Sequence, residues 1–276
     1  MSILVVGLSH RGVPLGLLER MTVPASRVPK ALADLGGRDF LSEAVILSTC
    51  HRTEVYAVAE RFHGGVQDIR NFLSELAFVA PEDFSDHLLS YHDDAAVRHL
   101  FSVACGLDSV VRGESQILGQ VRTAWERARD EGTCGPALDA LFRHALVAGK
   151  RARSETAIGR GVVSLSQAAI SLVTDRLGSL EGRRIAVLGA GEMGEGVVAG
   201  LAPTPATGSG PDVVVASRTR HRALTVAERI GARAVDLAGL DEALDEVDLL
   251  VTATGSPSVV ITAAQMADVV RRRRGR

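Results

Sequence analysis

Residues 184–194, RIAVLGAGEMG, join a short apolar run to a GxGxxG motif. The apolar run at 185–188 predicts a buried strand, and a helical pattern follows the motif. Between a strand and a helix, such glycines make a tight turn, admit a phosphate close to the backbone and let the two elements pack. The free N–H groups that begin the helix attract the anion. We therefore predict a dinucleotide-binding loop, the alternative being a structural turn without a ligand; its residues are Gly189, Ala190, Gly191, Glu192, Met193 and Gly194.

The chain beyond this loop continues to alternate between strand and helix. Apolar runs at 213–216 and 247–253 predict two more strands, and a helical pattern that reaches Ile230 separates them. Strands that alternate with helices are typical of a parallel, doubly wound sheet. We therefore predict a Rossmann-like NADP-binding domain over residues 183–276.

The end of the second predicted strand distinguishes the two nicotinamide cofactors. NAD-binding sheets usually place an acid there, which bonds to the ribose 2′-hydroxyl. This chain has Ser217, Arg218 and Thr219 at that point, and no acid. Because a guanidinium pairs bidentately with a phosphate, the pattern favours NADPH. The alternative is that Arg218 is a solvated residue that begins the next helix.

Residues 1–160 have a different organisation. Up to about Tyr91 the pattern is β-α-β-β-α-β, a split βαβ arrangement, and it then becomes helical up to about Leu177. We predict an α/β chain whose N-terminal split βαβ and helical bundle form a catalytic domain over 1–160, followed by a connecting helix over 161–182. The expected strands are 3–8, 44–49, 54–59 and 87–91, and the helices between them are near 28–35 and 66–76.

Composition excludes several classes of protein. The 31 Lys and Arg residues and 33 Asp and Glu residues nearly balance, which excludes a uniformly basic nucleic-acid coat. No run of about 18 apolar residues is long enough for a transmembrane helix. The three cysteines have no CxxC spacing, which argues against a disulfide framework and a zinc site. We expect a cytoplasmic protein with no membrane partner and no metal.

Cys50 is the candidate nucleophile. It follows the predicted strand 44–49 and lies in a polar turn beside Arg52, and a neighbouring positive charge favours the thiolate. The alternative is a packed, unreactive cysteine. Cys105 lies on an apolar helical stripe and is expected in the core, and Cys134 lies in a turn and receives no role.

His99 lies on the predicted helix that begins near Asp94. At about 100° per residue, an expected core face forms, and His99 lies nearly opposite it among small residues; the core face comprises Val97, Leu100, Phe101 and Ala104. This position gives room for a ligand, and the alternative is a surface or hydrogen-bonded histidine.

The next helix begins near Ser115 and carries two stripes. Ile117 and Val121 belong to a core stripe, whereas Gln116 and Gln120 belong to a polar one. The polar stripe is either solvated or, together with the preceding Ser109, Glu114 and Ser115, a hydrogen-bonding surface for a polar amino-acid substrate. The pattern alone does not decide between these interpretations.

Taken together, these segments resemble glutamyl-tRNA reductases. The segments GLSHR at 7–11, STCHRTE at 48–54, GESQILGQV at 113–121 and RSET at 153–156 occur with the GxGxxG motif in the family's order over nearly all the chain. The resemblance implies NADPH-dependent reduction of the glutamyl ester of tRNA(Glu) to glutamate-1-semialdehyde, the first step of tetrapyrrole biosynthesis, through a cysteine thioester.

The resemblance also implies roles for individual residues. Cys50 matches the nucleophile and His99 a histidine that assists catalysis, and Arg52 has the chemistry to pair with the substrate carboxylate. Residues 1–160 then become the glutamate-recognition domain. The predicted substrate-binding residues are Thr49, His51, Arg52, Ser109, Glu114, Ser115, Gln116 and Gln120.

The chain departs from the family pattern in two ways. Position 51 is His where the family has Asn, so a titratable ring replaces a neutral amide beside the nucleophile. The chain also ends before the family's dimerisation region and before an expected final strand and helix of the cofactor domain. The family is homodimeric, and the downstream glutamate-1-semialdehyde aminomutase is a candidate partner. Candidate tRNA contacts are the basic tail 271–276 and a cluster of Arg143, Lys150, Arg151 and Arg153.

Two other functions fit the same pattern. One is an NADPH-dependent reductase of a free small carbonyl compound, which would need neither Cys50 nor tRNA. The other is a truncated, non-catalytic remnant that binds glutamyl-tRNA.

Overall fold

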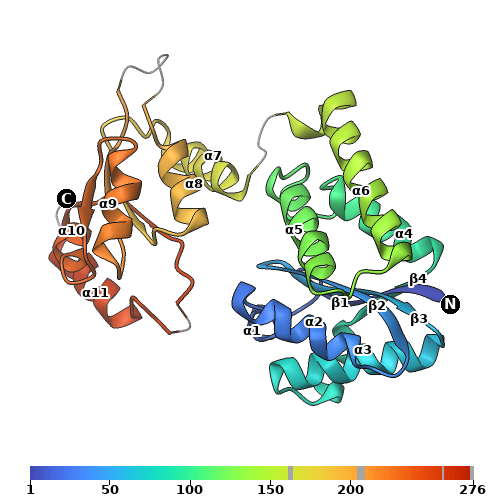
Figure 1. Ribbon diagram of the computed structural model, residues 1–276. Helices are drawn as coiled ribbons and strands as arrows, with labels where there is room; N and C mark the ends of the chain where they lie inside the picture. The colour runs from blue at the N-terminus through green and yellow to red at the C-terminus, as the bar shows by residue number, and fades with distance from the viewer. Residues whose placement is uncertain (161–163, 204–208, 257, 274–276) are drawn as a thin grey trace. The chain divides into compact units, whose positions relative to one another are not determined.

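The computed structural model of the protein describes residues 1–160, 164–203, 209–256 and 258–273 (Figure 1). The chain divides into two compact units, Met1–Val163 and Ser164–Arg276. Each unit combines a sheet with helices, which confirms the predicted α/β class. No helix in the described ranges combines the length and apolar character needed to cross a bilayer.

The first unit contains a four-stranded antiparallel sheet in the order β2-β3-β1-β4. The central strand β3 is buried along its whole length, so both faces of the sheet must be covered. The strands are β1 (Ser2–Ser9), β2 (Leu41–Thr49), β3 (Arg52–Ala59) and β4 (Leu89–His92).

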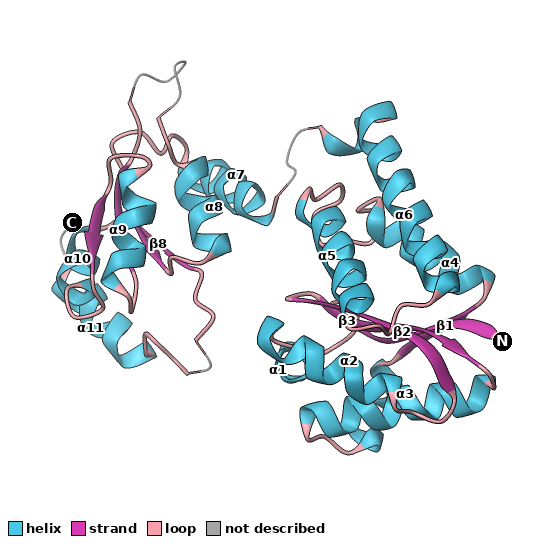
Figure 2. Cartoon of the chain, in the orientation of Figure 1, coloured by secondary structure: helices cyan, strands magenta, loops and turns pink. Residues whose placement is uncertain are grey.

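Two layers of helices cover this sheet, as Figure 2 shows. One face carries α1 (Leu15–Met21), α2 (Val28–Gly36) and α3 (Phe62–Ala77). The opposite face carries α4 (Asp94–Ala104), α5 (Gln116–Asp130) and α6 (Pro136–Glu155). Short 3-10 turns occupy Ala25–Arg27, Pro81–Asp83, Ser85–His87 and Ala157–Gly159.

Three details of this unit differ from the sequence expectations. The helix α1 was not predicted, because it is only two turns long and buries only Leu18 and Met21. The strand expected at 87–91 begins at Leu89, because a 3-10 turn occupies the residues before it. On α4 the predicted core residues Leu100 and Ala104 are buried, Val97 and Phe101 are only partly buried against the same core, and Ala96 and Val103 are buried as well.

The loop between α4 and α5 is fixed by two glycines and one arginine. Gly106 and Gly113 have φ of +76° and +82°, and a Cβ on Gly113 would lie 1.8 Å from the carbonyl oxygen of Ile158. Arg153 donates hydrogen bonds to the carbonyl oxygens of Ala104 and Glu114, both at 2.8 Å. The guanidinium of Arg153 therefore braces this loop, and both of its terminal nitrogens already bind protein carbonyls.

The second unit contains a four-stranded parallel sheet in the order β7-β6-β5-β8. Ile185 and Val187 belong to a core on one face, and Ala186 and Leu188 belong to a core on the other. Helices therefore cover both faces, as a doubly wound sheet requires. The strands are β5 (Arg184–Leu188), β6 (Asp212–Ala216), β7 (Arg233–Val235) and β8 (Leu249–Thr252), and the helices are α7 (Leu165–Leu177), α8 (Glu192–Gly200), α9 (Arg220–Glu228), α10 (Leu240–Glu246) and α11 (Ala263–Arg272).

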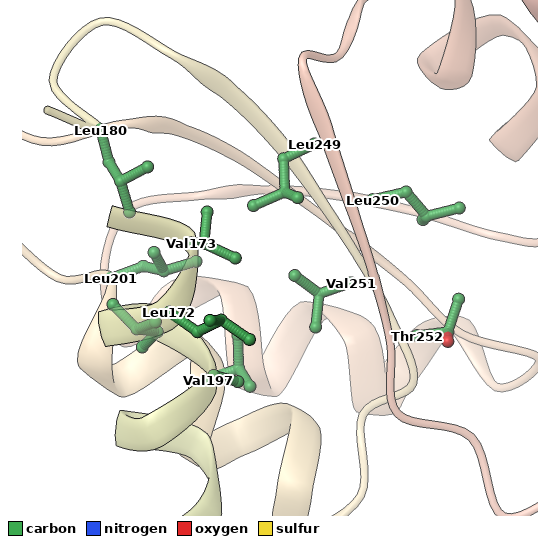
Figure 3. A pocket seen from close by; sticks show the side chains of 11 residues that line it. Leu172, Val173, Leu180, Val197, Leu201, Leu249, Leu250, Val251 and Thr252 are labelled. Atoms are coloured by element: carbon green, nitrogen blue, oxygen red, sulfur yellow. The ribbon is translucent and has the colours of Figure 1, made fainter. Parts of the chain in front are cut away.

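The helix α7 packs beside α8 at one edge of this sheet. Leu172 and Val173 of α7, Val197 of α8 and Val251 of β8 line an apolar pocket of about 250 Å³ (Figure 3). The predicted connecting segment 161–182 thus contains α7, while residues 161–163 lie outside the described part of the chain.

The fit of Gly113 against Ile158 can be tested by substitution. We expect Gly113→Ala to lower the free energy of unfolding by about 3 kcal/mol, because it adds a steric clash to the cost of a positive φ. Gly132 is a matched control, because its φ is +72° and its position is open. Gly132→Ala should cost about 1 kcal/mol. Urea denaturation measures both values, and equal losses would contradict the described loop packing.

Candidate functional site

Cys50 and His51 form the two-residue turn that joins β2 to β3. The register pairs Thr49 with Arg52, which leaves these two residues as the connection. Cys50 is exposed, and its Sγ lies 3.2 Å from Nδ1 of His51. The backbone N–H of His51 donates to Oγ1 of Thr49 at 3.1 Å. The predicted nucleophile therefore lies at the surface, on a turn that its neighbours hold in place.

A buried ionic network begins two residues after Cys50. Alternation along β3 places Arg52, Glu54 and Tyr56 on one face of the sheet. Arg52 is 1% exposed, and its Nη1 donates to Glu54 at 2.8 Å. Its Nη2 donates to the carbonyl oxygen of Asp108 at 2.6 Å and to the Asp108 carboxylate at 3.1 Å. Arg11, which is largely exposed, binds the same carboxylate at 2.9 Å.

Glu54 is the centre of this network and is fully buried. It accepts hydrogen bonds from Arg52, from the Tyr56 hydroxyl at 2.6 Å and from His99 Nε2 at 3.0 Å. Burial raises the pKa of Glu54, but the charge of Arg52 and the hydrogen bond from His99 outweigh it and hold the pKa below its usual value. Glu54 is therefore an ionised carboxylate inside the protein.

His99 lies against the buried face of α4, not opposite it. Its imidazole stacks on Tyr56 with ring centroids 6.4 Å apart, and its side chain is 11% exposed. The small residues of α4 pack inward, which removes the open space expected beside His99. Since an ionised Glu54 only accepts, His99 Nε2 carries the hydrogen and Nδ1 is the remaining ring nitrogen.

The predicted glutamate-binding residues fall into two sets. Thr49, His51 and Arg52 lie at the turn, and Ser109 lies directly after Asp108. Ser109 is 8% exposed, and its hydroxyl is buried without a hydrogen-bond partner in the described part of the chain. A buried polar group in this state is suited to a ligand. The second set, Glu114, Ser115, Gln116 and Gln120, lies at the end of the loop and on the first two turns of α5.

Three functional candidates in this unit were missed by sequence reasoning. Glu54, Tyr56 and Asp108 belong to the network, although none was predicted in the site. The available signal was the RTEVY stretch of β3, in which polar side chains alternate within an otherwise apolar strand.

In the second unit, a pocket of about 560 Å³ lies beyond the carboxyl ends of β5, β6 and β8. It is lined by six predicted cofactor residues, which are Gly189, Ala190, Gly191, Ser217, Arg218 and Thr219. The other three predicted cofactor residues do not line this pocket but begin α8; they are Glu192, Met193 and Gly194. Arg222, from the first turn of α9, also lines the pocket and was not predicted.

The three glycines of the loop have separate tasks. Gly189 has φ of +118°, and a Cβ there would lie 2.2 Å from the carbonyl oxygen of Ala253. A Cβ on Gly194 would lie 1.9 Å from the carbonyl oxygen of Gly189, so this glycine allows helix and strand to approach. Gly191 faces open space, which leaves room for a group to approach its backbone. The loop geometry fits a dinucleotide phosphate.

Most of the candidate tRNA-contacting arginines are already paired. Arg143 binds Asp139 at 3.0 Å, and Arg151 binds Glu155 at 2.9 Å. In the tail, Arg271 pairs with Asp268 and Arg272 with Asp245. Residues 274–276 lie outside the described part of the chain.

Comparison with known proteins identifies the family. A family model described as "Glutamyl-tRNAGlu reductase, N-terminal domain" matches residues 6–156. The chain belongs to the glutamyl-tRNA reductase family. A second model, "Shikimate / quinate 5-dehydrogenase", matches residues 171–276 and indicates a nucleotide-cofactor-binding domain.

Individual relatives agree with this family. Glutamyl-tRNA reductase from Salinispora arenicola is 46% identical over 263 residues, which cover 95% of the chain and 57% of the relative. The enzyme from Bacillus velezensis is 41% identical, with coverage of 100% and 60%. The solved glutamyl-tRNA reductase from Methanopyrus kandleri is 36% identical with a TM-score of 0.53, and the match covers 99% of this chain and 64% of that one. The chain thus spans about three-fifths of the length of these curated relatives.

The charge on Glu54 should support the fold of this unit. We expect Glu54→Gln to lower the free energy of unfolding at pH 7 by about 3 kcal/mol, near the lower end of the cost of breaking a buried ion pair, since Asp108 still binds Arg52. Because the pKa of Glu54 is lowered on folding, its stabilisation is present above about pH 4.5 and is lost as the pH falls through the folded pKa.

Glu75 provides the matched control for this prediction. It binds Arg38 at 2.6 Å, but its side chain is 60% exposed. Glu75→Gln should change the unfolding free energy by less than about 1 kcal/mol. Chemical denaturation of both variants between pH 3 and pH 7 compares them, and similar losses would contradict a buried, ionised Glu54.

Proposed function

We propose that the chain reduces the glutamyl ester of glutamyl-tRNA(Glu) to glutamate-1-semialdehyde with NADPH, through a thioester on Cys50. The observation that carries this proposal is the exposed Cys50 in contact with an imidazole, at a turn within the region that matches the reductase family. The reaction is the first step of tetrapyrrole biosynthesis.

The chemistry needs a thiol at this position. The thiolate of Cys50 attacks the ester carbonyl, a C–S bond forms, and the bond to the ribose oxygen of the tRNA breaks. A thioester is more easily reduced than the ester, so one difficult step becomes two easier ones. The other cysteines are poorly suited, since burial raises the pKa of Cys105, and raises that of Cys134 to about 11.

The glutamyl group is proposed to bind beside this turn. The unpartnered Ser109 hydroxyl offers one hydrogen bond, and Thr49, Glu114, Ser115, Gln116 and Gln120 are proposed to supply others. Arg52 already binds Glu54 and Asp108, so a substrate carboxylate would have to use the remaining edge of its guanidinium. His99, oriented by Glu54, is proposed to assist through Nδ1.

NADPH is proposed to bind in the pocket of the second unit. Gly189 and Gly191, with the N-terminus of α8, would hold the pyrophosphate. Arg218 and Arg222 would hold the 2′-phosphate, because both residues line the pocket and β6 ends without an acid. When bound, NADPH supplies the hydride that reduces the thioester.

The same proposal implies partners and a cellular location for the chain. The substrate makes tRNA(Glu) a partner, and the aldehyde product needs an enzyme such as the glutamate-1-semialdehyde aminomutase to consume it. We also propose a cytoplasmic location.

The role of Cys50 can be tested in a single turnover with glutamyl-tRNA, with and without NADPH. We expect Cys50→Ser to abolish both the acyl-enzyme and the aldehyde, because a hydroxyl at neutral pH lacks the nucleophilicity of a thiolate. Cys105→Ser and Cys134→Ser should remain active. Aldehyde formation by the Cys50→Ser variant would exclude the thioester route.

Cofactor choice can be tested by binding alone. We expect Arg218→Ala to weaken NADPH binding by about 1.5–3 kcal/mol, the contribution of a charge-assisted hydrogen bond, and to leave NADH binding unchanged. Arg220→Ala is the control, because Arg220 is a neighbouring exposed arginine outside the pocket lining. Titration calorimetry measures both cofactors, and equal dissociation constants in the unsubstituted chain would contradict the preference.

A further inference from the structure

Cys50 and His51 are consecutive residues whose side chains meet. In an extended strand, neighbouring side chains point to opposite faces and do not touch. Here both residues lie in the turn between the paired Thr49 and Arg52, and the Sγ–Nδ1 distance is 3.2 Å. The turn therefore brings a proton acceptor into contact with the thiol.

The backbone of His51 is held by hydrogen bonds on two sides. The His51 backbone donates to Thr49 Oγ1, and its carbonyl accepts from the backbone N–H of His10 at 2.8 Å. The edge of one ring meets the face of the other, since the His10 and His51 rings lie 6.1 Å apart at 79°. The end of β1 therefore supports the β2–β3 turn in which His51 contacts Cys50.

The charged groups around the turn are paired with one another. Arg11 and Arg52 carry two positive charges, and Asp108 and Glu54 balance them with two negative ones. Arg52 is thus not the uncompensated cation that the sequence suggested. Burial, and then the charge of Arg52, hold the pKa of His10 below its usual value, so His10 is neutral near pH 7.

We propose that His51 is a catalytic residue whose Nδ1 accepts the proton of the Cys50 thiol. The S–H bond breaks, an N–H bond forms, and the thiolate is left beside an imidazolium. Resting on the proposed function, the same proton then passes to the ribose oxygen that leaves as the C–S bond forms, which returns His51 to its neutral form.

The test measures the reaction of Cys50 with a neutral dipyridyl disulfide between pH 5 and pH 9. The full chain, carrying Cys105→Ser and Cys134→Ser, is compared with the same chain that also carries His51→Asn. With His51 present, we expect the rate to rise in the range where imidazoles titrate. With His51→Asn, the rate should rise only toward about pH 8.5, as for an ordinary thiol.

At pH 6.5 the His51→Asn variant should react about fivefold more slowly. This factor combines two effects of the substitution. The variant has a roughly fiftyfold smaller thiolate fraction, but its more basic thiolate is roughly tenfold more nucleophilic. His51→Gln repeats the measurement with a second neutral side chain, and His221→Asn, at an exposed site in the second unit, should leave the profile unchanged. Circular dichroism checks that each variant is folded.

Identical pH profiles with and without His51→Asn would overturn this proposal. The measurement uses neither tRNA nor NADPH, so it is independent of the proposed reduction. A shifted profile in a chain that forms no aldehyde would support the Cys50–His51 pair and contradict only the proposed function. An active reductase with an unshifted profile would support the proposed function and contradict the Cys50–His51 pair.

Discussion

Opposite charges lie side by side on the central strand of a sheet that is covered on both faces. Arg52 and Glu54 of β3 are both almost fully buried and are 2.8 Å apart. Such a pair adds little stability compared with well-packed apolar residues, but either charge alone would be costly. The arrangement of neighbouring elements must therefore satisfy both groups. Glu54 binds His99 of α4, and Arg52 binds Asp108 in the loop that follows it.

The need to pair the buried Arg52 connects the interior of the first unit to its surface. Asp108 binds the buried Arg52 on one side and the exposed Arg11 on the other. Ser109 follows directly, with a hydroxyl that has no partner in the described chain. Arg153 braces the same loop through the carbonyl oxygens of Ala104 and Glu114. The polar groups near Cys50 are thus held by contacts from several elements, which keeps their geometry fixed before a ligand arrives.

Local patterns in the sequence predicted the parts of the fold that local physics determines. The GxGxxG loop is one, because the carbonyl oxygen that Gly194 approaches belongs to Gly189 in the same loop. The exposed turn at Cys50 is another, since a polar segment between two apolar runs has few alternatives. The strand β7 was missed because it contains only Arg233–Val235, and three residues are too few to show an alternating hydrophobic pattern.

Other parts depend on contacts that a linear pattern does not contain. The core face of α4 was predicted only in part, because Ala96 and Val103 beside His99 are buried too, and size alone did not distinguish a packed face from an open one. The sequence placed Arg52 beside Cys50 but did not reveal its ion pair with Asp108, which is 56 residues away. Arg222 reaches the cofactor pocket only because α9 begins at the end of β6.

The turn at Cys50 also bears on how such a site changes during evolution. Most catalytic pairs join residues from distant segments, so altering one requires the surrounding fold to preserve the geometry. Here the acceptor is the next residue in the chain, and its backbone is fixed by hydrogen bonds with the Thr49 side chain and the His10 main chain. Codons for Asn and His differ by a single nucleotide. A lineage can therefore gain or lose this imidazole in one mutational step, with the scaffold of the active site left intact.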